Sequence, residues 1–257
     1  MYELSTRVRD RFRYSPREQR EILISAVIFG FIISFRSWGV VEFNVTTGII
    51  NWIFSSIAVF VAMFASISVQ KIVALGVGYE MDYFWWFQGM LIGLFLSFVS
   101  YGFIPFLYPG TTYFRHQKGL RLGKFRYGTM KKDMAVASVA GIAINVMIAL
   151  IFGFVYLVTK NYWILLFIKI NFIYAFFSVL PLPRISGIKL GQGATPGFHI
   201  FFFGRPLFVF ILVFLIAYSL LIYTSITLFG GWITLLLALI IGAIATFFFV
   251  KYSDDAF

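Results

Sequence analysis

The side chains that could take part in catalysis or metal binding are few in this chain. It contains no cysteine, which excludes disulfides, thiolate zinc sites, iron–sulfur clusters and cysteine nucleophiles. Histidine occurs only at His116 and His199, so a three-histidine zinc site cannot be built within one chain. No aspartate or glutamate occurs between Met134 and Ser253. An intramembrane aspartyl protease, which needs an acid on each of two facing helices, is therefore excluded.

Two pairs of polar side chains are spaced so that they could form a site. Ser66 and Gln70 are four residues apart and share one helical face, where they would line a polar pocket or tie two helices together. We favour the helix tie. Ser68 and Lys71 could form a serine–lysine dyad, which needs a desolvated, neutral lysine. We favour a Lys71 that extends to the cytoplasmic interface from the end of its helix. For Lys169, we favour packing or extension to the outer surface over a buried functional cation, because no neighbouring acid can pair with it.

The composition places these side chains in a membrane. Of the 257 residues, 61% are hydrophobic and 12% are charged, whereas soluble domains contain about 45–50% apolar and about 25% charged residues. The mean hydropathy is +0.91. The net charge of +11 would fit nucleic-acid binding, but the basic residues lie in loops beside apolar stretches, which is typical of a membrane topology signal. We therefore expect a lipid bilayer as the partner and no nucleic acid.

Six apolar stretches are expected to cross the membrane as helices. Ser15, with Glu18 three residues later, predicts a capped helix start, and Pro16 suits the first helical position. That helix runs into the first stretch. The six stretches are about 22–35, 50–75, 134–159, 162–182, 206–228 and 230–250.

A seventh apolar stretch, 83–108, is expected not to cross. Its glycines and Pro105 make it the least helical of the apolar runs, so we interpret it as re-entrant or membrane-embedded. The basic segments 1–20, 109–133 and 183–205 then all lie on the cytoplasmic side. Both termini are cytoplasmic in this arrangement.

Four segments of the chain carry a resemblance to a known family. They are Ser15–Ser25, Lys71–Glu80, Tyr108–Tyr113 taken with Ala140–Asn145, and Asn171–Gly187. In order and spacing they resemble the site-2 protease family of intramembrane zinc metalloproteases, in the form common in archaea. The resemblance covers roughly residues 15–210. It implies a strand that starts after Pro109-Gly110. Independently of the resemblance, Pro181 and Pro183 predict that the helix over 162–182 stops or kinks there.

The zinc site that the resemblance implies is missing from this sequence. The His-Glu-x-x-His motif falls on residues 66–70, so Ser66 and Gln70 replace the two histidines and Ile67 replaces the general base. The aspartate ligand falls on Ser186, and the substrate-orienting asparagine falls on Ser178. Hydroxyl and carboxamide groups are poor zinc ligands, and isoleucine cannot take a proton from water. We expect no zinc, no other cofactor and no catalytic residue.

The sequence thus predicts an all-α polytopic membrane protein. It would have six transmembrane helices, the re-entrant or membrane-embedded segment, and a small basic cytoplasmic hairpin around Gly119, Gly123 and Gly128. We expect a basic N-terminal segment (1–21), a single bundle (22–250, with the protease-like core at about 50–190) and a cytoplasmic tail (251–257). Such a pseudoprotease would bind or regulate membrane proteins through their transmembrane helices, and its basic loop would contact anionic lipid headgroups.

Two other functions stay open at this level. The chain could be an active intramembrane protease whose ligands come from His116, His199, Glu80 and Asp82. It could also be a passive channel or carrier, although no repeated half, charged pore ring or matching pair of interrupted helices is visible.

Overall fold

A computed structural model of the chain describes residues 2–39, 43–117, 130–182, 193–225 and 231–254. Five helical segments are long and apolar enough to cross a membrane: Pro16–Trp38, Val45–Gly76, Lys131–Thr159, Tyr162–Val179 and Thr234–Ser253. The chain is therefore a largely helical protein of membrane type. The elements in chain order are α1 (Tyr2–Arg11), α2 (Pro16–Ser34), η1 (Phe35–Trp38), α3 (Val45–Gly76), β1 (Tyr79–Phe84), α4 (Phe87–Val99), β2 (Thr111–His116), α5 (Lys131–Thr159), α6 (Tyr162–Val179), α7 (Pro196–Phe203), α8 (Arg205–Ser225) and α9 (Gly231–Asp254).

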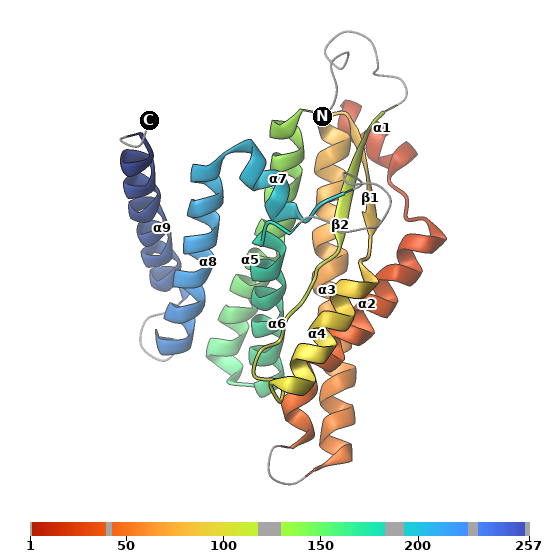
Figure 1. Cartoon of the computed structure of the whole chain (residues 1–257), viewed down its shortest axis with the longest axis vertical. Helices are drawn as coiled ribbons and strands as arrows, with labels where there is room; N and C mark the ends of the chain where they lie inside the picture. Colours follow the sequence, from red (N-terminus) through yellow and green to blue (C-terminus); the bar gives the residue numbers. More distant parts are fainter. Residues whose placement is uncertain (1, 40–42, 118–129, 183–192, 226–230, 255–257) are drawn as a thin grey trace.

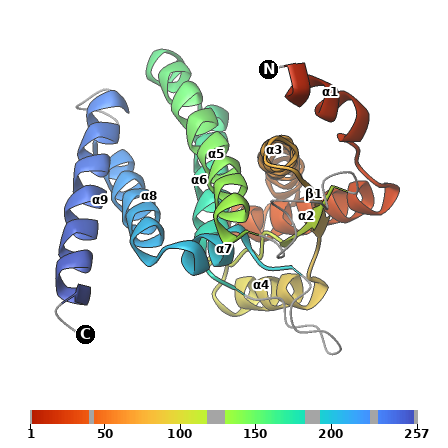
Figure 2. The same cartoon turned by 90° about the horizontal axis from the view of Figure 1, so that it is seen from above.

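The long helices stand side by side in one bundle (Figure 1). α2 packs on α3, α3 on α5, and α5 on α6. α8 and α9 form a hairpin beside this group and contact it through α5, α6 and α7 (Figure 2). The two termini lie at the same end of the molecule, which is also where α3 ends and α5 begins.

The start of α2 confirms the predicted capping signal. The Ser15 side chain accepts a hydrogen bond from the backbone N–H of Glu18, and the Glu18 side chain accepts one from the backbone N–H of Ser15. Pro16 occupies the first helical turn, where its missing N–H costs nothing. The cap fixes the point at which the chain turns from the linker after α1 into the bundle.

The segment between β1 and β2 leaves the two-stranded sheet and returns to it. The strands are antiparallel, and Phe84 is paired with Thr111, so residues 85–110 begin and end at the same place. Within this segment, α4 has 13 residues, which corresponds to about 20 Å. The strand expected after Pro109-Gly110 is present as β2. Among the described residues, β2 pairs with β1, which precedes α4. The basic hairpin expected around Gly119, Gly123 and Gly128 lies outside the described residues and stays a prediction.

Two short helices, α1 and α7, lie where none is expected from the sequence. α7 follows the buried Thr195 and has Pro196 in its first turn, which is a recognisable helix start. α1 is polar on average and carries no apolar stretch. The remaining boundaries agree with expectation to within a few residues. α6, for example, ends at Val179, two residues before Pro181.

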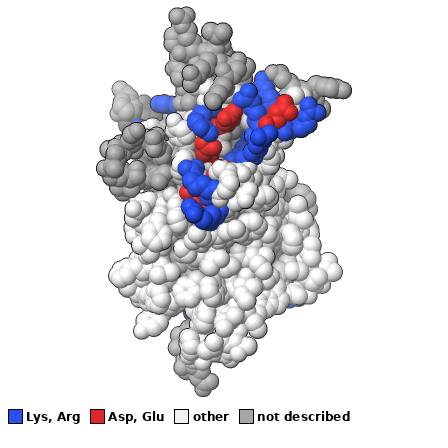
Figure 3. All heavy atoms as spheres, turned by 90° about the vertical axis from the view of Figure 1, so that its right-hand side faces the viewer, with Lys and Arg blue, Asp and Glu red and all other residues white. Residues whose placement is uncertain are grey.

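Charged side chains are concentrated at one end of the molecule. Figure 3 shows lysine, arginine, aspartate and glutamate gathered toward the upper end of this face, above a broad and largely uncharged surface. Many of the exposed side chains lower in the bundle are large and apolar, for example Ile53, Ile57 and Phe95. This distribution suits a bundle whose sides contact lipid and whose charged end contacts water.

Candidate functional site

Ser66 and Gln70 lie on the buried face of α3 where it crosses α5. Ser66 Oγ donates a 2.8 Å hydrogen bond to the carbonyl oxygen of Gly141, and Gln70 Nε2 donates one of 3.1 Å to Ser66 Oγ. Gly141 permits this close approach, because a Cβ atom there would lie 2.2 Å from Gln70 Nε2. The two side chains therefore join α3 to α5, in agreement with the helix-tie interpretation of this pair.

The other positions of the implied zinc site that the structure describes do not add ligands to this pair. Ile67 is 1% exposed and belongs to the hydrophobic core that includes Met63 and Tyr174. Ser178 donates its hydroxyl proton to the carbonyl oxygen of Tyr174 on its own helix, at 2.8 Å. Ser186 lies outside the described residues, so its convergence with Ser66 stays a prediction.

The donor groups that the structure does place here do not fit a zinc ion. Zinc in proteins is bound by imidazole, thiolate or carboxylate groups. The Ser66 hydroxyl is instead engaged both as a donor to Gly141 and as an acceptor from Gln70. Within the described ranges, no group of three histidine, aspartate or glutamate side chains could hold a metal ion.

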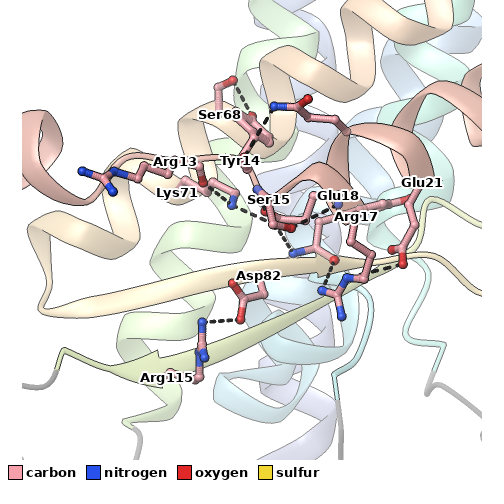
Figure 4. Close-up of polar contacts among 12 residues, drawn as sticks. Arg13, Tyr14, Ser15, Arg17, Glu18, Glu21, Ser68, Lys71, Asp82 and Arg115 are labelled. Carbon is pink, nitrogen blue, oxygen red and sulfur yellow. Dashed lines mark hydrogen bonds and ion pairs between the residues drawn. The ribbon is translucent and has the colours of Figure 1, made fainter.

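The serine–lysine dyad is not formed, because its two members have other partners (Figure 4). Ser68 Oγ shares a 2.8 Å hydrogen bond with the Tyr14 hydroxyl. Lys71 Nζ makes a 2.8 Å ion pair with Glu18 and donates to the carbonyl oxygen of Arg13. Burial raises the pKa of Tyr14 to about 12, so its hydroxyl stays protonated beside Ser68.

The expectation that Lys71 extends to the interface is wrong. Its side chain lies in the protein with 5% exposure, and Glu18, its partner, is 2% exposed. The ammonium group also lies 4.7 Å from the centroid of the Tyr14 ring, a favourable cation–π distance. A buried charge of this kind is tolerated because it is paired and hydrogen-bonded. Lys169, by contrast, is exposed on the surface of α6, in agreement with the preference against a buried cation.

The alternative ligand set does not converge in the structure. Residues that pair across β1 and β2 point to the same face of the sheet, and neighbours along a strand point to opposite faces. His116 pairs with Tyr79 on the buried face, whereas Glu80 and Asp82 lie on the other face. Glu80 pairs with Arg11 and Asp82 pairs with Arg115, both at 2.6 Å.

His199 is held as a neutral side chain on α7. Its ring packs edge-on against Phe114 at a centroid distance of 5.2 Å, and Nε2 lies 3.4 Å from the carbonyl oxygen of Thr112. Burial lowers the pKa of His199 to about 4, and the Thr112 carbonyl opposes this only in part. His199 thus serves the packing of α7 on β2.

Two carboxylates of α2 hold the outer edge of β1, a contact that the sequence did not predict. Glu18 Oε1 accepts a 2.8 Å hydrogen bond from the backbone N–H of Tyr83, and Glu21 Oε2 accepts one of 3.1 Å from that of Trp85. On the other edge, Thr112 N donates to the carbonyl oxygen of Ala194. No local sequence signal links these residues, because more than 60 positions separate each glutamate from its strand partner.

Comparison with known proteins gives one informative similarity. A protein of Methanocaldococcus jannaschii named "Putative zinc metalloprotease" is 29% identical to the chain over 184 residues, which is 70% of this chain and 85% of that protein. This similarity supports a metalloprotease-like family. No family model matches the chain. No solved structure matches it.

Proposed function

We propose that the chain is a catalytically inactive membrane protein of the site-2 protease type, which binds or regulates other membrane proteins. The observation that carries the proposal is the hydrogen-bonded contact of Ser66 and Gln70 with Gly141. It occupies the positions at which the resemblance implies two zinc ligands, and Ile67 occupies that of the general base. In this proposal the helices of the protease fold are kept, whereas the side chains that would bind the zinc ion are replaced.

The proposed membrane arrangement has six crossings, made by α2, α3, α5, α6, α8 and α9, with both termini in the cytoplasm. This arrangement is supported by the position of the two termini, which lie at the same end of the molecule as the charged surface. α8 runs antiparallel to α9 along its length, so it would cross with α9. α4 would be re-entrant, since about 20 Å of helix is shorter than the roughly 30 Å hydrocarbon layer and the chain returns to pair with the strand that it left. The basic segment 109–133 would contact anionic headgroups at the cytoplasmic surface.

Zinc analysis of the purified chain tests the proposal. We expect far less than one zinc per chain, because a hydroxyl and a carboxamide bind zinc weakly. The variant that combines Ser66→His, Ile67→Glu, Gln70→His and Ser186→Asp serves as the control and should bind about one zinc per chain. Stoichiometric zinc in the unaltered chain would refute the proposal. A folded control variant without zinc would refute the alignment of these four positions.

A helical reporter substrate distinguishes the remaining functions. The Methanocaldococcus jannaschii relative is named "Putative zinc metalloprotease", so chelator-sensitive cleavage would favour an active enzyme. Retention of the intact reporter on the immobilised chain would support binding without cleavage. Solute flux in proteoliposomes, with neither cleavage nor retention, would favour a channel or carrier.

A further inference from the structure

A charged pocket lies at the bend between α1 and α2 and is here called the elbow pocket. It has a volume of about 420 Å³ and is formed by the α1–α2 linker, the end of α3 and the outer face of the two strands. Four basic residues and three acidic residues line it, among them Arg11, Arg13 and Arg115. A volume of this size is in the range of small-ligand sites.

One arginine that lines the elbow pocket forms no ion pair among the described residues. Each acid is paired with one base: Glu18 with Lys71, Glu80 with Arg11, and Asp82 with Arg115. The Arg13 guanidinium has no ion-pair partner in the part of the chain that the structure describes. It extends away from the Lys71–Glu18 pair (Figure 4). Two of the three pairs are partly exposed, and such pairs contribute little to stability. The pocket therefore offers positive charge to an incoming anion.

An apolar groove begins where the elbow pocket ends. This α2–α3 groove has a volume of about 260 Å³ and is lined by Tyr14, Gln19, Ile22, Leu23, Phe60 and Phe64. Tyr14 lines both hollows. Its ring stacks on Phe64 at a centroid distance of 5.3 Å, and its hydroxyl bonds to Ser68. Tyr14 is thus the boundary between a charged site and an apolar one.

The two hollows lie at the level where the charged surface gives way to the apolar one. The membrane-type helix begins at Pro16, which lines the elbow pocket, and the groove residues of α2 follow within its first two turns. Figure 3 shows the charged region ending above the uncharged side of the bundle. Headgroup phosphates would lie at the depth of the pocket and acyl chains at the depth of the groove.

We propose that the elbow pocket and the α2–α3 groove together bind one anionic phospholipid. Its phosphate lies near Arg13, and one hydrocarbon chain lies between α2 and α3 against Leu23 and Phe64. A guanidinium suits this role, because it donates paired hydrogen bonds to phosphate oxygens. The polar and apolar hollows, joined at Tyr14, match the two parts of a lipid.

Native mass spectrometry of the delipidated full chain in detergent tests this proposal. Phosphatidylglycerol, phosphatidylcholine and glycerol 3-phosphate are titrated separately. We expect one phosphatidylglycerol per chain to bind more tightly than either other probe. Arg13→Ala should weaken phosphatidylglycerol binding about fivefold. Leu23→Trp, which fills the groove, should weaken binding of both lipids.

Arg20→Ala is the matched control, because Arg20 is an exposed arginine of α2 that lines neither hollow. It should leave phosphatidylglycerol binding unchanged, and circular dichroism should show that all variants fold. If Arg20→Ala and Arg13→Ala weaken phosphatidylglycerol binding equally, the attraction is non-specific and the proposal is overturned. Equal binding of the two lipids would also overturn it. Glycerol 3-phosphate that binds as tightly as phosphatidylglycerol would indicate an anion site without a lipid.

Discussion

At the scale of single residues, Lys71 shows that the position of a charged residue along the sequence does not reveal its ion-pair partner. A lysine near the end of an apolar stretch is ordinarily expected to reach the interface. Here its partner, Glu18, is 53 positions away and also receives the N–H of Tyr83. The carboxylate therefore connects α2, α3 and β1 at one point. Only the packed fold brings these three elements together.

Removal of one member of this pair should destabilise the protein strongly. We expect Lys71→Met to lower the free energy of unfolding by about 3–5 kcal/mol, because it leaves the Glu18 carboxylate buried without its cation. The double variant Glu18→Gln with Lys71→Met should be more stable than Lys71→Met alone, since glutamine is neutral and can keep the capping contact. Unfolding of detergent-solubilised protein by a denaturing detergent measures both. Glu18→Gln alone completes the comparison: if the loss of stability in the double variant equals the sum of the losses in the two single variants, Glu18 and Lys71 are not coupled.

At the scale of elements, the sequence predicts what depends on local pattern. The long helices follow from apolar length, the start of α2 from Ser15 and Glu18, and the end of α6 from Pro181. The pairing of β2 with β1 depends on contacts between strands separated by α4, and it was not predicted. For the site, the shared face of Ser66 and Gln70 follows from helical spacing. Their partner Gly141 is 75 positions from Ser66, and no pattern in the sequence predicted this contact.

The contact of α3 with α5 should depend on the absence of a side chain at position 141. We expect Gly141→Ala to destabilise the protein by about 1–3 kcal/mol, because the new Cβ atom would collide with the Gln70 side chain. Gly153→Ala, on the same helix, is the control: nothing lies within 4 Å of its Cβ position. It should be neutral or stabilise the helix by up to about 1 kcal/mol. Thermal unfolding in detergent measures both, and equal effects would contradict the proposed tie.

At the scale of the whole molecule, the most general property is that charged residues gather at one end of the bundle. The charged end carries α1, the outer face of the strands and the start of α5, whereas the opposite end holds the short turn between α5 and α6. The loop that contains α4 does not disturb this separation, since it begins and ends at the strands. The pairing of β1 with β2 supports the proposed re-entrant path of residues 85–110, because a single crossing would carry the two strands to opposite sides.

The sidedness of this arrangement can be measured by cysteine labelling, because the chain has no native cysteine. Lys132→Cys and Lys160→Cys form a matched pair, since both replace exposed lysines near opposite ends of α5. A membrane-impermeant maleimide added to intact cells should label the cysteine at 160 and leave that at 132 unlabelled until the membrane is permeabilised. Lys251→Cys, near the end of α9, should behave like Lys132→Cys, because basic flanks are retained in the cytoplasm and α9 ends at the charged end. External labelling at 132 would show that the protein has the opposite orientation in the membrane. Labelling at 132 and 251 from opposite sides would instead show that α6, α8 and α9 do not all cross.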